Sequence, residues 1–265
     1  MLQLILLALI QGITEFLPIS SSGHLILLPN LTGMADQGQA IDVAVHVGTL
    51  AAVVLYFWRD VRVAALGTVD LIRGRRQTPG ARLAFGLIIA TIPVVIAGLL
   101  IKITGLDEAL RSVAVIGWTM LGFGLVLYWA DQRGPVHKQE QDWGAMDALK
   151  MGLWQAVALI PGTSRSGICI TGGRFLGYNR HDAAKIAMLM SIPTILASGA
   201  LLGLEVASEA DASVAIDGLI GAVFAFGAAL AALTLMMRLL RSVSFTPYVI
   251  YRVILGAGLL VYAYA

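Results

Sequence analysis

Six long apolar runs constrain this chain more than any other feature of its sequence. They cover residues 42–58, 83–101, 113–130, 186–204, 219–237 and 248–264, and charged residues, glycine or proline close each one. Because the hydrocarbon core of a bilayer takes roughly 20 helical residues, each run is long enough to cross it as a helix. Hydrophobic residues make up 58% of the 265 residues and charged residues only 13%. The sequence therefore predicts an all-α integral membrane protein.

Residues 1–28 are also largely apolar, but they do not have the pattern of a cleaved signal peptide. A signal peptide needs a positively charged start, and no Lys or Arg precedes Arg59. The single cysteine, Cys169, excludes an internal disulfide and a cysteine-clustered metal site. The net charge of +2 is too small to suggest a nucleic-acid partner.

The basic residues divide the connecting segments into two sides. Of the 18 Lys and Arg residues, 15 lie in the four regions 59–82, 131–150, 174–185 and 238–252. By the positive-inside rule these regions are cytoplasmic, with Arg252 in the first turn of the last span. The segments 29–42, 102–111 and 205–217 hold eight of the 16 acidic residues and two cations, so we expect them on the outer side. Arg165 is then the only cation expected away from the aqueous loops.

Two further segments carry a polar turn between apolar arms that are too short to cross the bilayer. They are "QGITEFLPISSSGHL" (residues 11–25) and "LWQAVALIPGTSRSGICI" (residues 153–170), each with arms of about ten residues. We expect both to form re-entrant helical hairpins, because irregular backbone within a membrane must be buried in protein or line a cavity. The first, about 1–28, enters from the outer side. The second, about 146–175, has basic flanks and enters from the cytoplasmic side.

The two halves of the chain also resemble each other. Gln11 precedes "SSSG" at the same spacing at which Gln155 precedes "SRSG". We therefore predict one membrane domain, 1–265, built as an inverted repeat of 1–130 and 146–265. Each half contains one re-entrant hairpin and three transmembrane helices. The broken helices of such repeats meet near the membrane midplane.

The polar residues of the hairpins suggest a site for a phosphorylated group. The Arg165 guanidinium can donate two parallel hydrogen bonds to phosphate oxygens, and helix starts rich in serine and glycine favour an anion. Gln11 and Glu15 share one helix face and could hold a hard cation together with substrate phosphates. The alternative is that Arg165 pairs with Glu15 and that the serines only pack helices. The candidate phosphate-binding serines are Ser20, Ser22, Ser164 and Ser166.

Ser21 and His24 are candidates for the chemistry itself. They stand three residues apart, close enough on a helical turn for hydroxyl and imidazole to meet. A serine beside a base is a potential nucleophile, and a histidine can transfer the proton. An equally good interpretation is that Ser21 caps the helix and His24 lines a polar cavity. His46, inside a predicted span, is a weaker candidate, with a packed histidine as the favoured interpretation. His137 and His181 are interpreted as solvated loop residues.

These motifs resemble the two signatures of the bacterial undecaprenyl-diphosphate phosphatase family, the integral-membrane type associated with bacitracin resistance. The first motif has Gln11, three residues, Glu15, a serine-rich turn and His24, and "PGTSRSG" (residues 161–167) matches the second. Order, spacing and length agree along nearly the whole chain. One departure is that the second signature usually reads PGxSRSxxT. Cys169 stands at the position of that threonine, with Thr171 two residues later, so a hydroxyl contact is missing or displaced.

The resemblance implies hydrolysis of undecaprenyl diphosphate to undecaprenyl phosphate and inorganic phosphate in the bacterial cytoplasmic (inner) membrane. This reaction recycles the lipid carrier of peptidoglycan synthesis. The resemblance also implies a divalent cation, Mg²⁺ or Ca²⁺, with Gln11 and Glu15 as metal ligands. Glu15, Ser21, His24 and Arg165 would be catalytic, with either Ser21 or a water as the attacking group. We expect the site to open toward the outer side.

A transporter of polyprenyl phosphate or another anion is the alternative function. Inverted repeats with broken helices are a transporter design. Pure transport would need Arg165 and the serines for binding, but it has no evident need for Ser21 beside His24. The sequence leaves a homodimer open.

Overall fold

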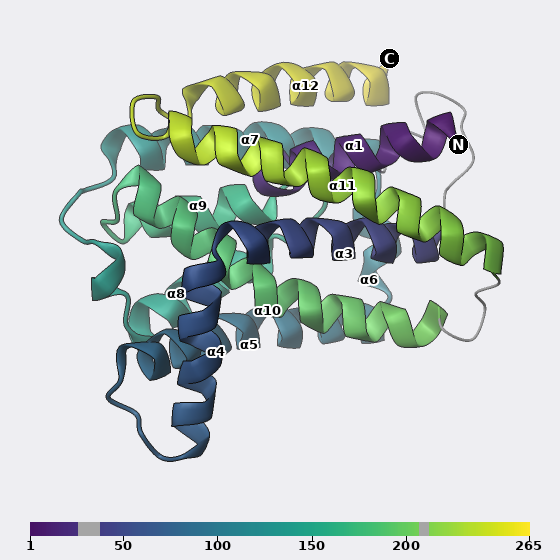
Figure 1. Cartoon of the computed structure of the whole chain (residues 1–265). Helices are drawn as coiled ribbons and strands as arrows, with labels where there is room; N and C mark the ends of the chain where they lie inside the picture. The colour runs from purple at the N-terminus through teal and green to yellow at the C-terminus, as the bar shows by residue number, and fades with distance from the viewer. Residues whose placement is uncertain (26–37, 207–211) are drawn as a thin grey trace.

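The structure is a computed structural model that describes residues 1–25, 38–206 and 212–265, and the regular elements in these ranges are helices (Figure 1). Six described helices are long and apolar enough to cross a membrane, and each coincides with a predicted run. The all-α integral membrane fold is therefore confirmed. The candidate spans are Gln39–Tyr56 (α3), Pro79–Thr104 (α5), Val113–Arg133 (α7), Arg180–Leu201 within α10 (Arg180–Val206), Val214–Leu239 within α11 (Ala212–Leu239) and Thr246–Tyr264 (α12).

Local signals explain where several of these helices begin and end. The Thr78 hydroxyl accepts the Ala81 N–H at 3.1 Å before α5, and Pro79 occupies its first turn. Such a cap and an early proline both favour a helix start. The same helix ends at Gly105, whose φ of 67° lies in the left-handed region that glycine adopts without strain.

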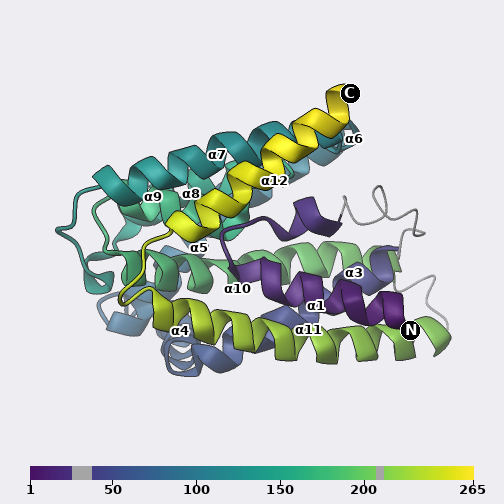
Figure 2. The ribbon, with the colours of Figure 1, turned by 90° about the horizontal axis from the view of Figure 1, so that it is seen from above.

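Most of the long helices pack side by side along a common direction. Helix α12 lies along α7, and α11 packs against α3 and α1 (Leu2–Phe16), as Figures 1 and 2 show. Glycines permit these close approaches. A Cβ at Gly12 of α1 would lie 2.6 Å from the Ala225 carbonyl oxygen of α11, and one at Gly48 of α3 would lie 2.2 Å from that of Ala222. Small residues at helix crossings are the usual means of close packing in membranes.

The two polar turns share an unusual backbone feature. Ser20 and Ser164 have positive φ angles of 75° and 71°. Each serine hydroxyl accepts the N–H three residues later, from Gly23 at 3.3 Å and from Gly167 at 3.1 Å. The second turn joins α8 (Ala145–Val157) to α9 (Arg165–Phe175). The first joins α1 to a helical stretch at 21–25, and residues 26–28 of that predicted hairpin lie outside the described residues.

The matching backbone of the two polar turns agrees with the prediction that the two halves of the chain are related. The inverted orientation of 1–130 and 146–265 in a membrane stays a prediction.

The prediction of a loop over 59–82 is wrong for its first part, where α4 (Trp58–Ile72) forms. The chain breaks at Phe57, and α4 turns away from the direction of α3 and packs against α5 (Figure 1). Val61 and Ala64, three residues apart, pack against the hydrophobic core. The arginines in this region obscured the short apolar face in the sequence.

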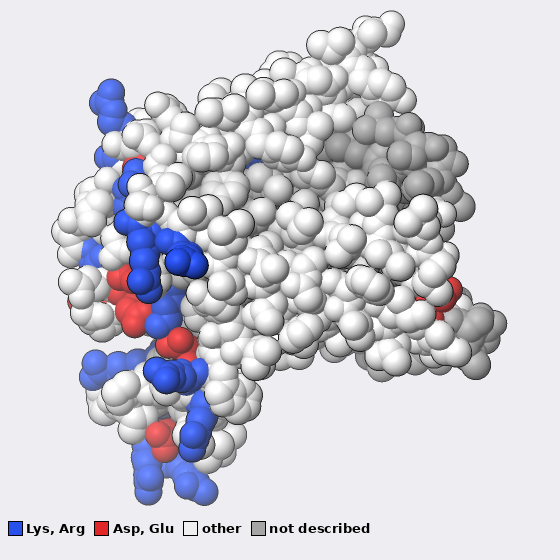
Figure 3. All heavy atoms as spheres, turned by 45° about the horizontal axis from the view of Figure 1, so that its top comes forward, with Lys and Arg blue, Asp and Glu red and all other residues white. Residues whose placement is uncertain are grey.

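Charged side chains gather in a band at one end of the molecule (Figure 3). We call this the charged end; it carries residues of the predicted cytoplasmic regions. Ion pairs join these regions: Lys185 Nζ lies 2.9 Å from Asp60 and 2.7 Å from Glu140, and Lys138 Nζ lies 2.7 Å from Asp147. These pairs link three of the four regions, and the Phe245 N–H donates to Asp131 Oδ2 at 3.2 Å, which brings the fourth to the same end, apart from Arg252.

Candidate active site

Glu15, near the end of α1, connects the two polar turns. Its Oε2 accepts hydrogen bonds from Gln11 Nε2 at 3.0 Å and from the Ser21 hydroxyl at 2.7 Å. Its Oε1 accepts a hydrogen bond from Arg165 Nη2 at 2.5 Å, across 150 residues of sequence. The carboxylate is buried, at 7% exposure of the side chain. Four predicted site residues therefore meet at one carboxylate, and the expected alternative pairing of Arg165 with Glu15 is present.

Three buried polar atoms, two on residues that contact this carboxylate and one in the second polar turn, have no hydrogen-bond partner within the described part of the chain. They are Arg165 Nη1, Gln11 Oε1 and Thr163 Oγ1. A buried polar atom without a partner costs about 1–3 kcal/mol, so native proteins satisfy nearly all of them. Two donors and one acceptor left open around a carboxylate and a guanidinium fit a site that a polar ligand completes.

The predicted binding serines are already engaged in the turns. Ser20 and Ser164 cap the following backbone, and the Ser166 hydroxyl donates to the Leu17 carbonyl at 2.9 Å, which joins the second turn to the first. The Ser164 and Ser166 hydroxyls lie 3.1 Å apart, and those of Ser20 and Ser22 lie 3.4 Å apart. These contacts give the serines a structural role. Their contacts with phosphate stay a prediction.

His24 bonds to groups other than Ser21. Its Nδ1 lies 2.6 Å from the Ser20 carbonyl oxygen and therefore carries the hydrogen, so Nε2 accepts from the Tyr251 hydroxyl at 2.6 Å. The two rings stack with centroids 5.7 Å apart. Tyr251, on α12, was not a candidate from the sequence, because nothing in the last apolar run distinguishes it from a lipid-facing tyrosine.

His46, the weaker histidine candidate from the sequence, lies beside the Glu15 carboxylate. Its side chain is 37% exposed, and its Nε2 lies 3.9 Å from Glu15 Oε2. Nδ1 donates to the Asp42 carbonyl at 2.7 Å, which orients the ring on α3. The polarity of a histidine inside an apolar span was the available signal.

The position of Arg252 corrects the prediction that Arg165 is the only cation away from the aqueous loops. Arg252 is fully buried in the second turn of α12, not in a cytoplasmic loop, so Arg165 is not the only buried cation. Its guanidinium donates to Pro18 O at 3.4 Å and Gly162 O at 3.1 Å, one carbonyl from each polar turn. It also donates to Thr119 O at 3.3 Å and Met120 O at 3.1 Å of α7. Five donors in a planar fork can serve four carbonyls at once, which explains an arginine here.

Cys169, at the position of the expected threonine, is buried within the second hairpin, on α9. Its Sγ lies 3.8 Å from Gln155 Oε1, the residue that matches Gln11 in the first half. Thr171 does not replace the missing hydroxyl, because its Oγ1 donates to the Gly167 carbonyl of its own helix at 2.8 Å.

The predicted metal ligands meet the requirement for a hard cation only in part. Gln11 Oε1 is an unpaired buried oxygen beside Glu15, which suits a hard cation. No group of three or more His, Cys, Asp or Glu side chains suited to a metal occurs among the described residues. A cation at Gln11 and Glu15 would therefore need phosphate and water oxygens to complete its coordination.

Comparisons with known proteins agree with this geometry. The family model described as "Bacitracin resistance protein BacA" matches residues 4–258. Proteins named "Undecaprenyl-diphosphatase" from Jannaschia sp. and Dinoroseobacter shibae are each 72% identical over 99% of this chain and 98% of their own length. "Undecaprenyl-diphosphatase 1" of Rhodospirillum rubrum is 48% identical over the whole chain and 95% of its own length. The chain therefore belongs to the BacA family of bacitracin resistance proteins.

Proposed function

We infer that this chain is an undecaprenyl-diphosphatase, a hydrolase that converts undecaprenyl diphosphate to undecaprenyl phosphate and inorganic phosphate. The three relatives above carry that name, two of them at 72% identity over almost the whole chain. The reaction regenerates the lipid carrier for cell-wall synthesis. With six candidate spans, the chain is a multi-pass membrane protein. We place it in the bacterial cytoplasmic membrane, with the charged end in the cytoplasm and the site open to the outer side.

One observation supports this activity best: the Ser21 hydroxyl donates to Glu15, which also accepts a hydrogen bond from Arg165. The carboxylate is placed to take the serine proton, and Arg165 keeps Nη1 unpaired for a phosphate oxygen. A transporter would use the arginine but not a serine held against a buried base. The contact therefore favours hydrolysis over the alternative of anion transport.

In the first step, Ser21 Oγ attacks the terminal phosphorus of the diphosphate while Glu15 takes the hydroxyl proton. The Oγ–P bond forms and the bond from phosphorus to the bridging oxygen breaks, so undecaprenyl phosphate leaves with that oxygen. Arg165 Nη1 donates to the phosphoryl oxygens, where negative charge spreads in the transition state.

In the second step, water attacks the phosphoserine and inorganic phosphate is released. Glu15 returns its proton to Ser21 Oγ as the O–P bond breaks, and His24 Nε2 takes a proton from the water after releasing Tyr251. Mg²⁺ or Ca²⁺ held by Gln11 and Glu15 would supply positive charge beside the phosphate oxygens.

The test is release of inorganic phosphate from undecaprenyl diphosphate by the purified protein in detergent, with and without EDTA. We expect release by the wild type, inhibition by EDTA, and losses in Ser21→Ala and Glu15→Gln. Ser198→Ala is the matched control, because its hydroxyl donates to the Ile195 carbonyl of its own helix at 3.2 Å, outside the candidate site. A folded wild-type protein that releases no phosphate would favour the transporter. Activity that survives in Ser21→Ala would make water the attacking group.

A further inference from the structure

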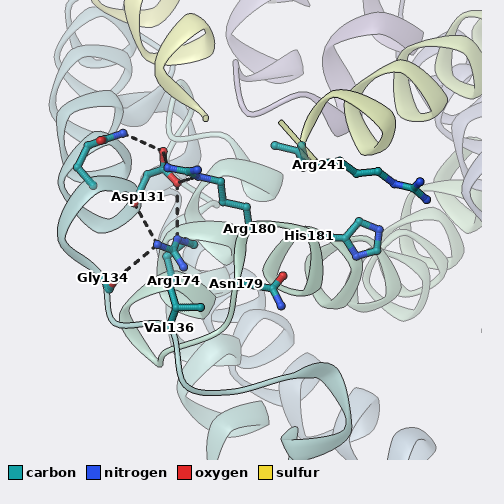
Figure 4. A pocket seen from close by; sticks show the side chains of 10 residues that line it. Asp131, Gly134, Val136, Arg174, Asn179, Arg180, His181 and Arg241 are labelled. Carbon is teal, nitrogen blue, oxygen red and sulfur yellow. Dashed lines mark hydrogen bonds and ion pairs between the residues drawn. The ribbon is translucent and has the colours of Figure 1, made fainter. Parts of the chain in front are cut away.

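A second polar pocket lies at the charged end, outside the candidate active site (Figure 4). Its volume is about 550 Å³, within the range of small-molecule sites. The end of α7 contributes Asp131 and α9 contributes Arg174. The start of α10 contributes Arg180 and His181, and Arg241 comes from the turn after α11.

The charges that line this pocket do not balance. The buried Asp131 carboxylate accepts hydrogen bonds from Arg180 Nε at 2.6 Å and Nη2 at 3.2 Å. Arg174, itself 3% exposed, brings Nε to 3.6 Å from the same carboxylate, and this Nε has no hydrogen-bond partner in the described part of the chain. One carboxylate thus faces two guanidinium groups, so one positive charge remains.

Arg241 adds another positive charge, with no carboxylate paired to it in the described part of the chain. Its side chain is exposed, and none of its side-chain nitrogens makes a hydrogen bond or ion pair within residues 1–25, 38–206 and 212–265. Figure 4 shows it extending past His181, on the side of the pocket away from Asp131. The lining residues therefore include three arginines and a single carboxylate. A group with two negative charges or with several acceptor oxygens would complete the pocket.

The depth of the pocket suggests where such a group comes from. Three candidate spans terminate around it: Val113–Arg133, Arg180–Leu201 and Val214–Leu239. The ends of spanning helices lie at the level of the lipid headgroups. Val136, which is 64% exposed, adds apolar surface at the rim. Basic pockets between transmembrane helices at this level suit anionic headgroups.

We propose that this pocket binds a phosphate group at the membrane surface. The exposed Arg241 side chain attracts the phosphate, and the Arg180–Asp131–Arg174 cluster supplies a fixed net positive charge along one side of the pocket. The phosphate is carried by an anionic lipid or is free in solution, since both present the same oxygens. This pocket is separate from the Glu15 site, and the proposal does not depend on the activity of that site.

The test measures lipid binding by native mass spectrometry in detergent, using phosphatidylglycerol and phosphatidylcholine with the same acyl chains. Calorimetry with inorganic phosphate forms a separate arm. Both arms use an Arg165→Ala background, so that the active site does not contribute. Arg241→Gln is the informative variant, and it should fold because its side chain is exposed. Arg75→Gln is the control, since it removes the same charge from an exposed turn after α4.

We expect Arg241→Gln to weaken binding about tenfold or more and Arg75→Gln to leave it unchanged. If only phosphatidylglycerol shows this loss, a lipid carries the phosphate. If inorganic phosphate alone shows it, the ligand is free phosphate. Equal affinity for the two lipids together with no binding of phosphate would overturn the proposal. So would equal losses in both variants, because the attraction would then be a general surface charge.

Discussion

At the residue scale, the site depends on two arginines with different environments. Arg165 meets a carboxylate, Glu15, and keeps one nitrogen unpaired. Within the described part of the chain, the Arg252 guanidinium donates only to backbone carbonyls, two of which belong to the polar turns. The first arginine is placed for ligand contact, and the second for holding the two turns together.

Arg165→Ala should lower kcat/KM for undecaprenyl diphosphate by roughly 10²–10³-fold, the effect typical of removing a donor to a developing anion. The measurement is phosphate release at several substrate concentrations. Arg111→Ala, a charge removal outside the site, serves as the control. Near-normal activity in a folded Arg165→Ala protein would show that the phosphate is held elsewhere.

Arg252→Lys should keep the charge but lose most of the carbonyl contacts, because an ammonium cannot reach four carbonyls from one position. Each lost hydrogen bond from a charged donor costs about 1.5–3 kcal/mol, so Tm should fall by several degrees and activity should fall with it. Thermal unfolding in detergent measures the first effect. An unchanged Tm would mean that the turns hold together without this side chain.

At the element scale, α1 carries Gln11 and Glu15 and is positioned by its contact with α11. Gly12 makes this contact possible, because a Cβ there would lie 2.6 Å from both the Ala225 carbonyl oxygen and the Ala228 Cβ. The helix itself is too short to cross the bilayer, so its packing must determine its depth and rotation.

Gly12→Ala should therefore displace α1 and reduce both Tm and phosphate release. The matched control is Gly122→Ala on α7, where an added Cβ meets nothing within 4 Å. That variant should be neutral or stabilised by up to about 1 kcal/mol, since alanine favours helix more than glycine. If both variants behave alike, the α1–α11 contact does not position the site.

At the scale of the whole molecule, the charged end predicts the orientation in the membrane. Cys169 is the only cysteine and is buried, so replacing it with serine gives a background for single-cysteine labelling. In intact cells, a membrane-impermeant maleimide should label Leu106→Cys, at the opposite end of α5, but not Arg75→Cys. Labelling of Arg75→Cys in intact cells would contradict the predicted topology. Permeabilised cells, in which both cysteines should react, provide the positive control.

The sequence by itself determined the class of fold, the six spans and the two polar motifs, because run length, charge and residue spacing are local properties. It also identified Glu15, Ser21 and Arg165, whose types are unusual within apolar arms. Only the tertiary structure brought in Tyr251 and Arg252 and placed His46, a weaker candidate from the sequence, beside Glu15. Tyr251 and Arg252 look ordinary within their own helix, and their partners lie in other helices or turns. Contacts between distant segments arise from packing, which no local pattern encodes.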